Sequence, residues 1–352
     1  MDQFVTVRIV QANAMDLTRF QFDFDLTFAA FFMNADGTIY GRFGSRSDAR
    51  EGERDITMPG FSKAMIKALE LHGDYPKNKR DLLGKQPTPT RITKPEQYPS
   101  LKQYKSKLDY GGEVVKSCLH CHQIRDAARE VYKAKGQALP SKEMYPYPMP
   151  DTVGMSLDPQ AMAKVAKVLS GSPAGRSGIK AGDVIKMFDG QPMLSIADVQ
   201  WVLHHAKDVD RIPVVVDRNG RQVKVTLSLP KDWRKKSDIS WRVSTWRLRR
   251  DNFGGMYPVD MTDEQRKHEG LSTTAMALRL KHVGQYGKHA VAKRAGFKKD
   301  DIIVGFGGLT KRMSETQLHA FVMSKHKPGS RLSVSVRRGG RLTKLSLVLP
   351  KW

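Results

Sequence analysis

An internal repeat constrains this chain more than any other feature of its sequence. The segment from Gly178 to Ile185 (GIKAGDVI) recurs as Gly296 to Ile303 (GFKKDDII). Each copy continues with a glycine turn, a helical pattern and a final hairpin that ends at a proline, Pro230 or Pro350. Two matching copies of this length are hard to obtain by chance, so the sequence predicts two modules with one shared fold.

The first 75 residues predict a smaller α/β segment. Residues 4–10 alternate and are β-branched, as in a strand, and residues 28–33 and 38–43 flank an Asp-Gly turn, as in a hairpin. Residues 59–72 have the spacing of an amphipathic helix. Residues 74–110 are rich in Lys, Pro and Tyr and predict a linker without regular structure.

We therefore expect a multidomain α+β protein. It should contain a partial thioredoxin-like α/β segment, a short helical segment around a Cys-x-x-Cys-His motif, and two β-rich modules of sandwich or barrel type. The expected parts are residues 1–75, a linker and Cys-x-x-Cys-His segment at 76–150, a first module at 151–231, a connector at 232–269 and a second module at 270–352.

The repeated order of strand, loop, Gly-Asp turn, helix and hairpin resembles the circularly permuted PDZ domains of bacterial extracytoplasmic proteins. The resemblance covers about residues 151–230 and 270–350. It implies that peptides or protein C-termini bind between a loop, whose amides hold the terminal carboxylate, and a helix. In the first module the implied residues are Val153, Gly154, Met155, Ser156, Val199 and Val202. In the second they are Met276, Leu278, Leu318 and Val322, and the loop there, Ala275 to Leu278, has no glycine.

The only two cysteines form the pattern Cys118-x-x-Cys121-His122, which is typical of c-type haem attachment. Two thioethers would join the cysteines to the haem, His122 would bind the iron, and Met149 is the candidate second axial ligand. The alternatives are a zinc site that uses these cysteines with His120 or His122, a reversible disulfide, or no cofactor.

The N-terminal order of strand, short helical turn, hairpin and helix resembles the C-terminal half of a thioredoxin fold. This chain has no thiol pair at that segment's helix start, so the resemblance implies no disulfide exchange there. Together, the three parts resemble a bacterial family of thioredoxin-like/PDZ domain proteins, some of which are selenoproteins. A gene model that restarts after a selenocysteine codon would explain both the half-domain and the absence of a leader.

The formal net charge of +24 suggests anionic partners, but no nucleic-acid-binding motif accompanies it, so we do not expect nucleic acid as the partner. No apolar run approaches the roughly 20 residues that span a bilayer. Residues 1–11 are too short and polar for a signal peptide. Read literally, this start predicts a cytoplasmic protein. If a leader has been lost from the sequence, the protein is expected to be periplasmic or otherwise extracytoplasmic.

These observations predict an extracytoplasmic redox-linked scaffold that binds peptides through its PDZ modules, carries a c-type haem and meets a redox partner protein. The alternative is a non-redox PDZ adaptor with a structural Cys pair or metal clip. No Gly-x-Ser-Gly-Gly nucleophile motif is present, so the sequence predicts that the chain is not a protease and not an enzyme. It does not predict the oligomeric state.

Overall fold

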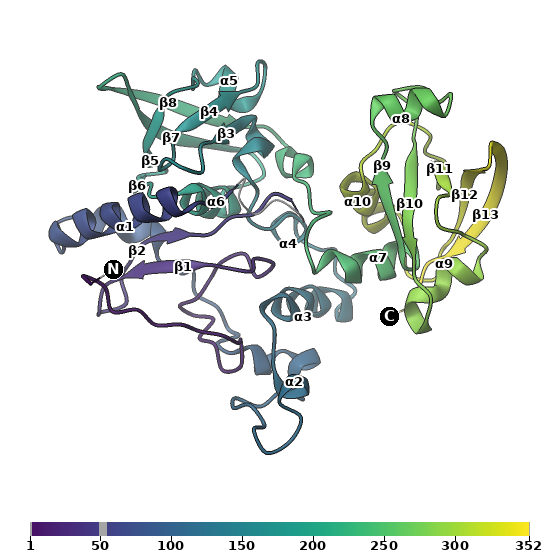
Figure 1. Ribbon diagram of the computed structural model, residues 1–352, viewed down its shortest axis with the longest axis horizontal. Coiled ribbons are helices and arrows are strands. Elements are labelled where there is room, and N and C mark those ends of the chain that lie inside the picture. Colours follow the sequence, from purple (N-terminus) through teal and green to yellow (C-terminus); the bar gives the residue numbers. More distant parts are fainter. Residues whose placement is uncertain (1, 49–54, 352) are drawn as a thin grey trace. The chain divides into compact units, whose positions relative to one another are not determined.

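The computed structural model describes residues 2–48 and 55–351 and divides into two compact units, residues 1–237 and 238–352 (Figure 1). Both units mix helices with small antiparallel sheets, so the expected mixture of helix and strand is confirmed. Among the described residues, no helix is long and apolar enough to cross a membrane.

The N-terminal part of the first unit is a two-stranded hairpin with one long helix. Its elements are β1 (Ala30–Met33), β2 (Ile39–Phe43) and α1 (Met58–Gly73). Gly37 occupies the turn at φ +89°, which favours glycine. Thr57 caps α1 by accepting a hydrogen bond from the amide of Gly60. The predicted hairpin and helix are therefore present.

The predicted strand at residues 4–10 is absent. This segment has no regular structure, and its side chains Val5 and Val7 are 96% and 81% exposed. Alternating β-branched residues form a strand only where a neighbouring strand supplies hydrogen bonds, and in the described residues the sheet here contains only β1 and β2. The thioredoxin-like part of the prediction is therefore not shown.

Side chains close the outer edge of β2. The Gln86 amide group accepts from the N–H of Ile39 and donates to its C=O, both at 3.0 Å. Further along, Asp198 accepts from the N–H of Arg42, and Ser195 donates to the Arg42 carbonyl. These contacts satisfy the backbone groups that point away from β1, and they tie β2 to the helix that carries Asp198.

The predicted linker is folded rather than structureless. Leu82 and Leu101 are buried in it, because short helical turns bring their side chains inward. Between residues 79 and 153 the elements are η2 (Lys79–Lys85), η3 (Pro95–Gln97), η4 (Pro99–Leu101), α2 (Val114–Ser117), α3 (Cys121–Ala134), α4 (Ser141–Met144) and η5 (Pro150–Val153).

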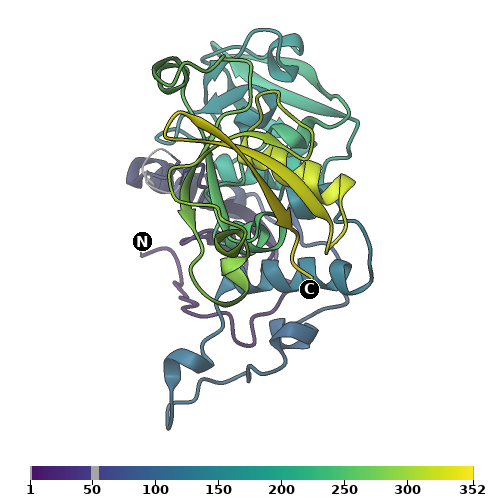
Figure 2. The same cartoon turned by 90° about the vertical axis from the view of Figure 1, so that its right-hand side faces the viewer.

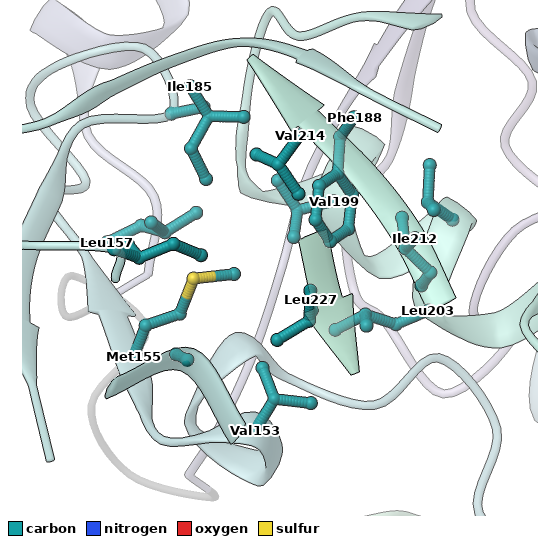
Figure 3. Close-up of a cluster of buried hydrophobic side chains, with 14 of the residues drawn as sticks. Val153, Met155, Leu157, Ile185, Phe188, Val199, Leu203, Ile212, Val214 and Leu227 are labelled. Carbon is teal, nitrogen blue, oxygen red and sulfur yellow. The ribbon is translucent and has the colours of Figure 1, made fainter. Parts of the chain in front are cut away.

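The rest of the first unit surrounds one apolar core. Its elements are β3 (Met155–Leu157), β4 (Val165–Val168), α5 (Pro173–Arg176), β5 (Val184–Phe188), β6 (Gln191–Pro192), α6 (Ile196–His205), β7 (Asp210–Arg218), β8 (Arg221–Leu229) and η6 (Trp233–Lys236). One sheet has the order β6-β5-β7-β8, and β3 pairs with β4 separately. Figure 3 shows Met155 and Leu157 pointing from β3 into the cluster that includes Val199 of α6.

The second unit contains one five-stranded sheet in the order β13-β12-β11-β10-β9. Its long final hairpin is the yellow ribbon in Figure 2. The elements are α7 (Thr245–Phe253), β9 (Met256–Asp260), α8 (Asp263–His268), β10 (Leu278–Val283), η7 (Gly287–Ala290), α9 (Val291–Arg294), β11 (Ile302–Phe306), α10 (Glu315–Lys325), β12 (Arg331–Arg338) and β13 (Arg341–Val348). The unit therefore begins within the predicted connector 232–269, because β9 belongs to its sheet.

Candidate functional site

The repeated motif builds the same polar clasp in both units. Asp183 is almost fully buried and accepts from Arg218 Nε and Nη2 at 2.7 and 2.8 Å, while Nη2 also donates to a backbone carbonyl. Asp301 and Arg338 repeat these contacts at 2.6 and 2.7 Å. Burial alone would raise the pKa of Asp183, but its hydrogen bonds from Arg218 outweigh burial and hold the pKa below its ordinary value.

The first unit has an open strand edge beside a glycine loop. Gly154 ends η5 at φ +85°, and its carbonyl accepts from the N–H of Leu169 in the segment after β4. Backbone groups alternate sides along an antiparallel strand, so the N–H and C=O of Met155 point away from β4. Among the described strands, β3 pairs only with β4, so that outward edge has no strand partner.

Gly154 is required where it lies. A Cβ atom at this position would come within 2.1 Å of the Ser172 Cβ, and φ +85° is unfavourable for any other residue. The close approach lets Ser172, which also caps α5, sit directly against the loop. The loop shape therefore depends on this glycine.

The predicted apolar groove residues of the first unit come together, but in the core. Val153, Met155, Val199 and Val202 are all buried, whereas Ser156 on β3 is exposed. Met155 and Val199 belong to one cluster. These side chains therefore hold β3 and α6 together beneath the open edge.

Two hollows lie along α6. One shallow hollow lies where the chain leaves β3 and α6 begins, and its lining includes Pro159, Met162 and Ile196. The other reaches Ala197 and Gln200 on the same helix. Both are lined on the other side by the hairpin β1–β2, which therefore forms part of the surroundings of α6.

Buried charge anchors α6 to the preceding chain. Lys85 Nζ and Asp198 Oδ2 lie 2.9 Å apart, and both side chains are essentially inaccessible to solvent. Desolvation lowers the pKa of Lys85, although Asp198 opposes this shift. The Arg42 guanidinium lies 3.6 Å from the centre of the Trp201 ring. These contacts fix the helix that carries Val199 and Val202.

The loop of the second unit is not where the sequence predicted it. Gly255 occupies the position of Gly154, because its carbonyl accepts from Gly284 N–H just as Gly154 accepts from Leu169. The strand after it, β9, pairs with β10 as β3 pairs with β4. The predicted equivalents, Met276 and Leu278, instead lie fully buried in the core.

The second loop therefore contains two glycines, at positions 254 and 255, and both have positive φ. The predicted helix residues Leu318 and Val322 are also buried in the core of this unit, on α10. The sequence Gly-Gly-Met at 254–256 could have identified the loop, because its last two residues match Gly154-Met155 of the first unit.

The cysteine motif begins helix α3. Cys118 and Cys121 are free thiols, and burial raises the pKa of Cys121. The Nδ1 atom of His122 is buried without a hydrogen-bond partner, and burial lowers the pKa of this imidazole. Within residues 2–48 and 55–351, no group of three or more metal-binding side chains was found, and the zinc alternative stays a prediction.

Met149 is not brought to the cysteine motif. It packs against the core cluster of the first repeated module, whereas Cys121 packs in a separate cluster with Leu119 and Ile124. The structure therefore does not assemble the predicted pair of axial ligands, His122 and Met149. Haem attachment at the two cysteines stays a prediction.

Comparison with known proteins identifies a PDZ domain at residues 150–229. A "Probable periplasmic serine endoprotease DegP-like" of Pseudomonas savastanoi pv. phaseolicola is 33% identical over 114 residues, which are 32% of this chain and 23% of the relative. The "Periplasmic pH-dependent serine endoprotease DegQ" of Escherichia coli K12 is 28% identical over 150 residues, 43% of this chain and 29% of the relative. The chain thus spans about a quarter of the length of these relatives.

One similar solved structure is "HtrA-type protease AlgW with decapeptide". It has a TM-score of 0.27 and 14% identity and covers 48% of this chain and 54% of that one. A TM-score this low does not establish a shared overall fold.

The relatives overturn the functional predictions. They are serine endoproteases, which points to proteolysis and contradicts both the redox-linked scaffold and the non-redox adaptor, as well as the prediction that the chain is not an enzyme. The PDZ resemblance of the first module is confirmed. The relatives are named as periplasmic, in line with an extracytoplasmic location, and nothing in them supports a redox partner.

Proposed function

We propose that this chain acts in extracytoplasmic proteolysis of the serine-endoprotease type, and that its PDZ domain at residues 150–229 captures chain ends or extended segments of protein substrates. The observation that carries the proposal is the open edge of β3, which lies next to the Gly154 loop within that PDZ domain. The hydrolytic part of the proposal is supported by the named activity of the relatives.

Capture would work by strand addition. An extended ligand backbone would pair with the outward N–H and C=O of Met155, and its terminal carboxylate would lie at the Gly154 loop. Main-chain pairing gives affinity for many sequences, which suits the recognition of unfolded protein substrates.

Binding of labelled peptides with apolar free C-termini, measured by fluorescence polarisation, tests the capture step. Replacement Gly154→Val should weaken binding by about 1–3 kcal/mol, roughly 5- to 150-fold in Kd, because the loop must move from Ser172. Gly220→Val is the matched control, since Gly220 also has positive φ but no neighbouring atom within 4 Å of a Cβ. Equal binding by wild type and Gly154→Val would exclude the loop.

Cleavage of a labelled unfolded protein tests the hydrolytic step. The full chain should degrade it, a serine-directed phosphonate reagent should block the reaction and label the protein, and Gly154→Val should slow it. Absence of both cleavage and labelling would refute hydrolysis by this chain while leaving the capture step to the binding assay.

Covalent haem at Cys118 and Cys121 can be tested separately. Protein exported together with a haem-attachment system should show haem absorbance after denaturation, and Cys118→Ser should reduce it. Colourless exported protein would refute the attachment.

A further inference from the structure

We propose that the second unit holds its own helix α7 in the groove between β9 and α10, so that this groove accepts a protein chain end only when α7 is displaced. The inference rests on the proposed function and extends it. Ligand capture is assigned to the first unit, and the second unit is assigned a similar peptide-binding groove that its own helix α7 fills.

The second groove has the same frame as the first. Gly255 repeats the loop position of Gly154, and Met256 follows it as Met155 follows Gly154. Because Gly255 pairs inward with Gly284, the N–H and C=O of Met256 point to the outer side of β9. In the described sheet β9 is the last strand, so its outer edge has no strand partner.

Arg249 of α7 spans the two walls of this groove. Its Nε and Nη2 donate to the two carboxylate oxygens of Glu315 on α10, at 2.5 and 2.9 Å. Its guanidinium carbon also lies 3.7 Å from the ring centre of Tyr257 on β9. Arg249 and Glu315 are both nearly inaccessible to solvent. One side chain therefore joins β9 to α10 where a ligand backbone would otherwise run.

The rest of α7 follows the same face of α10. Asn252 Nδ2 lies 3.0 Å from His319 Nδ1, and the Phe253 ring stacks on the His319 imidazole with centres 4.1 Å apart. Helix α7 packs against both β9 and α10. We call the contacts of Arg249, Asn252 and Phe253 with α10 the α7 clamp.

In the first unit the chain before Gly154 also lies against the neighbouring helix, because η5 packs on α6 and β3, and Gln200 Nε2 donates to the Tyr147 carbonyl at 2.9 Å. This segment has only the four-residue turn η5, whereas nine helical residues precede Gly254. Counted from the helix-capping serines Ser195 and Ser314, Ile196 of α6 corresponds to Glu315 of α10. Ile196 lines a hollow, while Glu315 is bound by Arg249. The two units thus differ in the length of the helical segment before the loop and in the residue that follows the capping serine, Ile196 or Glu315.

Peptide binding in a Gly154→Val background, which silences the first groove, tests the proposal in the full chain. With the α7 clamp intact, a peptide with an apolar free C-terminus should bind about 5- to 150-fold more weakly than to wild type. Replacements Arg249→Ala and Glu315→Gln should each restore most of the lost affinity. Arg250→Ala is the matched control, because Arg250 is on the same helix and pairs with Asp251 instead.

Hydrogen exchange of residues 245–253 gives an independent readout. These amides should exchange faster in Arg249→Ala, while the strands β12 and β13 keep their protection, which also shows that the unit stays folded. Faster exchange without any gain in peptide binding would overturn the proposal.

A reversible lock covers the case in which Arg249→Ala fails to fold. The lock is a disulfide between Asn252→Cys and His319→Cys, in a chain that also carries Cys118→Ser, Cys121→Ser and Glu315→Gln. When the disulfide is oxidised, the second groove should bind no peptide. When the disulfide is reduced, the second groove should bind peptide. Equal binding in both states would refute the clamp. Failure of wild type to bind any peptide counts against the proposed function, whereas the exchange data test the clamp alone.

Discussion

The two units share a frame and differ in what lies against it. In each, an Asp–Arg clasp (Asp183 with Arg218, Asp301 with Arg338) holds the turn of the repeated motif, and a positive-φ glycine precedes an outward-facing strand edge. In the first unit the neighbouring helix α6 is held by the buried ion pair of Asp198 with the distant Lys85, and by the segment before the loop, where Gln200 donates to the Tyr147 carbonyl. In the second, the segment before the loop is the nine-residue helix α7, and its Arg249 forms a buried ion pair with Glu315 of α10.

This difference teaches that a repeated fold does not fix the state of its binding edge. The motif residues determine the core and the clasp, and the Asp–Arg hydrogen bonds of the two clasps agree within 0.1 Å. The segments outside the motif decide whether the edge is covered. The following predictions test how far the units are alike and where they diverge.

The largest expected effect is on the first unit alone. Lys85→Met leaves the buried carboxylate of Asp198 without its cation, which should lower the free energy of unfolding of residues 1–237 by about 3–5 kcal/mol. The second unit should be unchanged, as measured by hydrogen exchange resolved along the chain. Lys231→Met, at an exposed lysine, is the control and should have little effect. Equal destabilisation of both units would contradict the division into two units.

The clasp should have the same strength in both units. Asp183→Asn and Asp301→Asn each weaken two hydrogen bonds with an arginine, and each should destabilise its own unit by about 1–3 kcal/mol in denaturant unfolding. If the losses of unfolding free energy caused by the two variants differ by more than about 2 kcal/mol, the clasp contributes unequally to the two units, and the comparison fails.

The smallest effect is a pH dependence confined to the first unit. His204 is half-buried, stacks on Tyr147 and accepts a hydrogen bond from the Tyr147 N–H at Nδ1, which favours the neutral imidazole. Burial lowers its pKa well below 6.5. Since the unfolded chain then binds more protons, stability should fall as the pH falls from 6.5 toward the lowered pKa.

Calorimetry between pH 8 and pH 5 should show this loss of stability, and His204→Gln should reduce it. His268→Gln, at an exposed histidine of the second unit, should leave the loss of stability at low pH unchanged. A wild-type melting temperature that is constant across this range would contradict the assignment.

The sequence predicted the repeated core well, because glycine turns and alternating apolar residues depend on local chemistry. The second loop was misplaced for a physical reason. Helix α8 lies between Gly255 and β10, so counting back from the motif at Gly296 led to Ala275–Leu278 instead of the glycine pair. In the structure, the hydrogen bond from Gly284 to Gly255 and the pairing of β9 with β10 reveal the equivalence.

Other parts of the structure had no local signal. The strand predicted at residues 4–10 failed because strand formation depends on a partner that the segment itself does not encode. The packing of Met149 on the PDZ core, away from Cys121, depends on contacts between segments far apart in the chain. The prediction about activity rested on the absence of one nucleophile motif, whereas the serine endoprotease activity is that of relatives which this chain matches over about a quarter of their length.

The closed edge of β2 has a consequence for behaviour at high concentration. Exposed strand edges let one molecule extend the sheet of another, which begins fibrils and insoluble aggregates. Gln86 occupies both hydrogen-bonding positions of Ile39, and Asp198 and Ser195 occupy those of Arg42. A neighbouring molecule therefore finds no free backbone groups along this edge of β2. At high concentration, aggregation by strand addition should not begin at that strand.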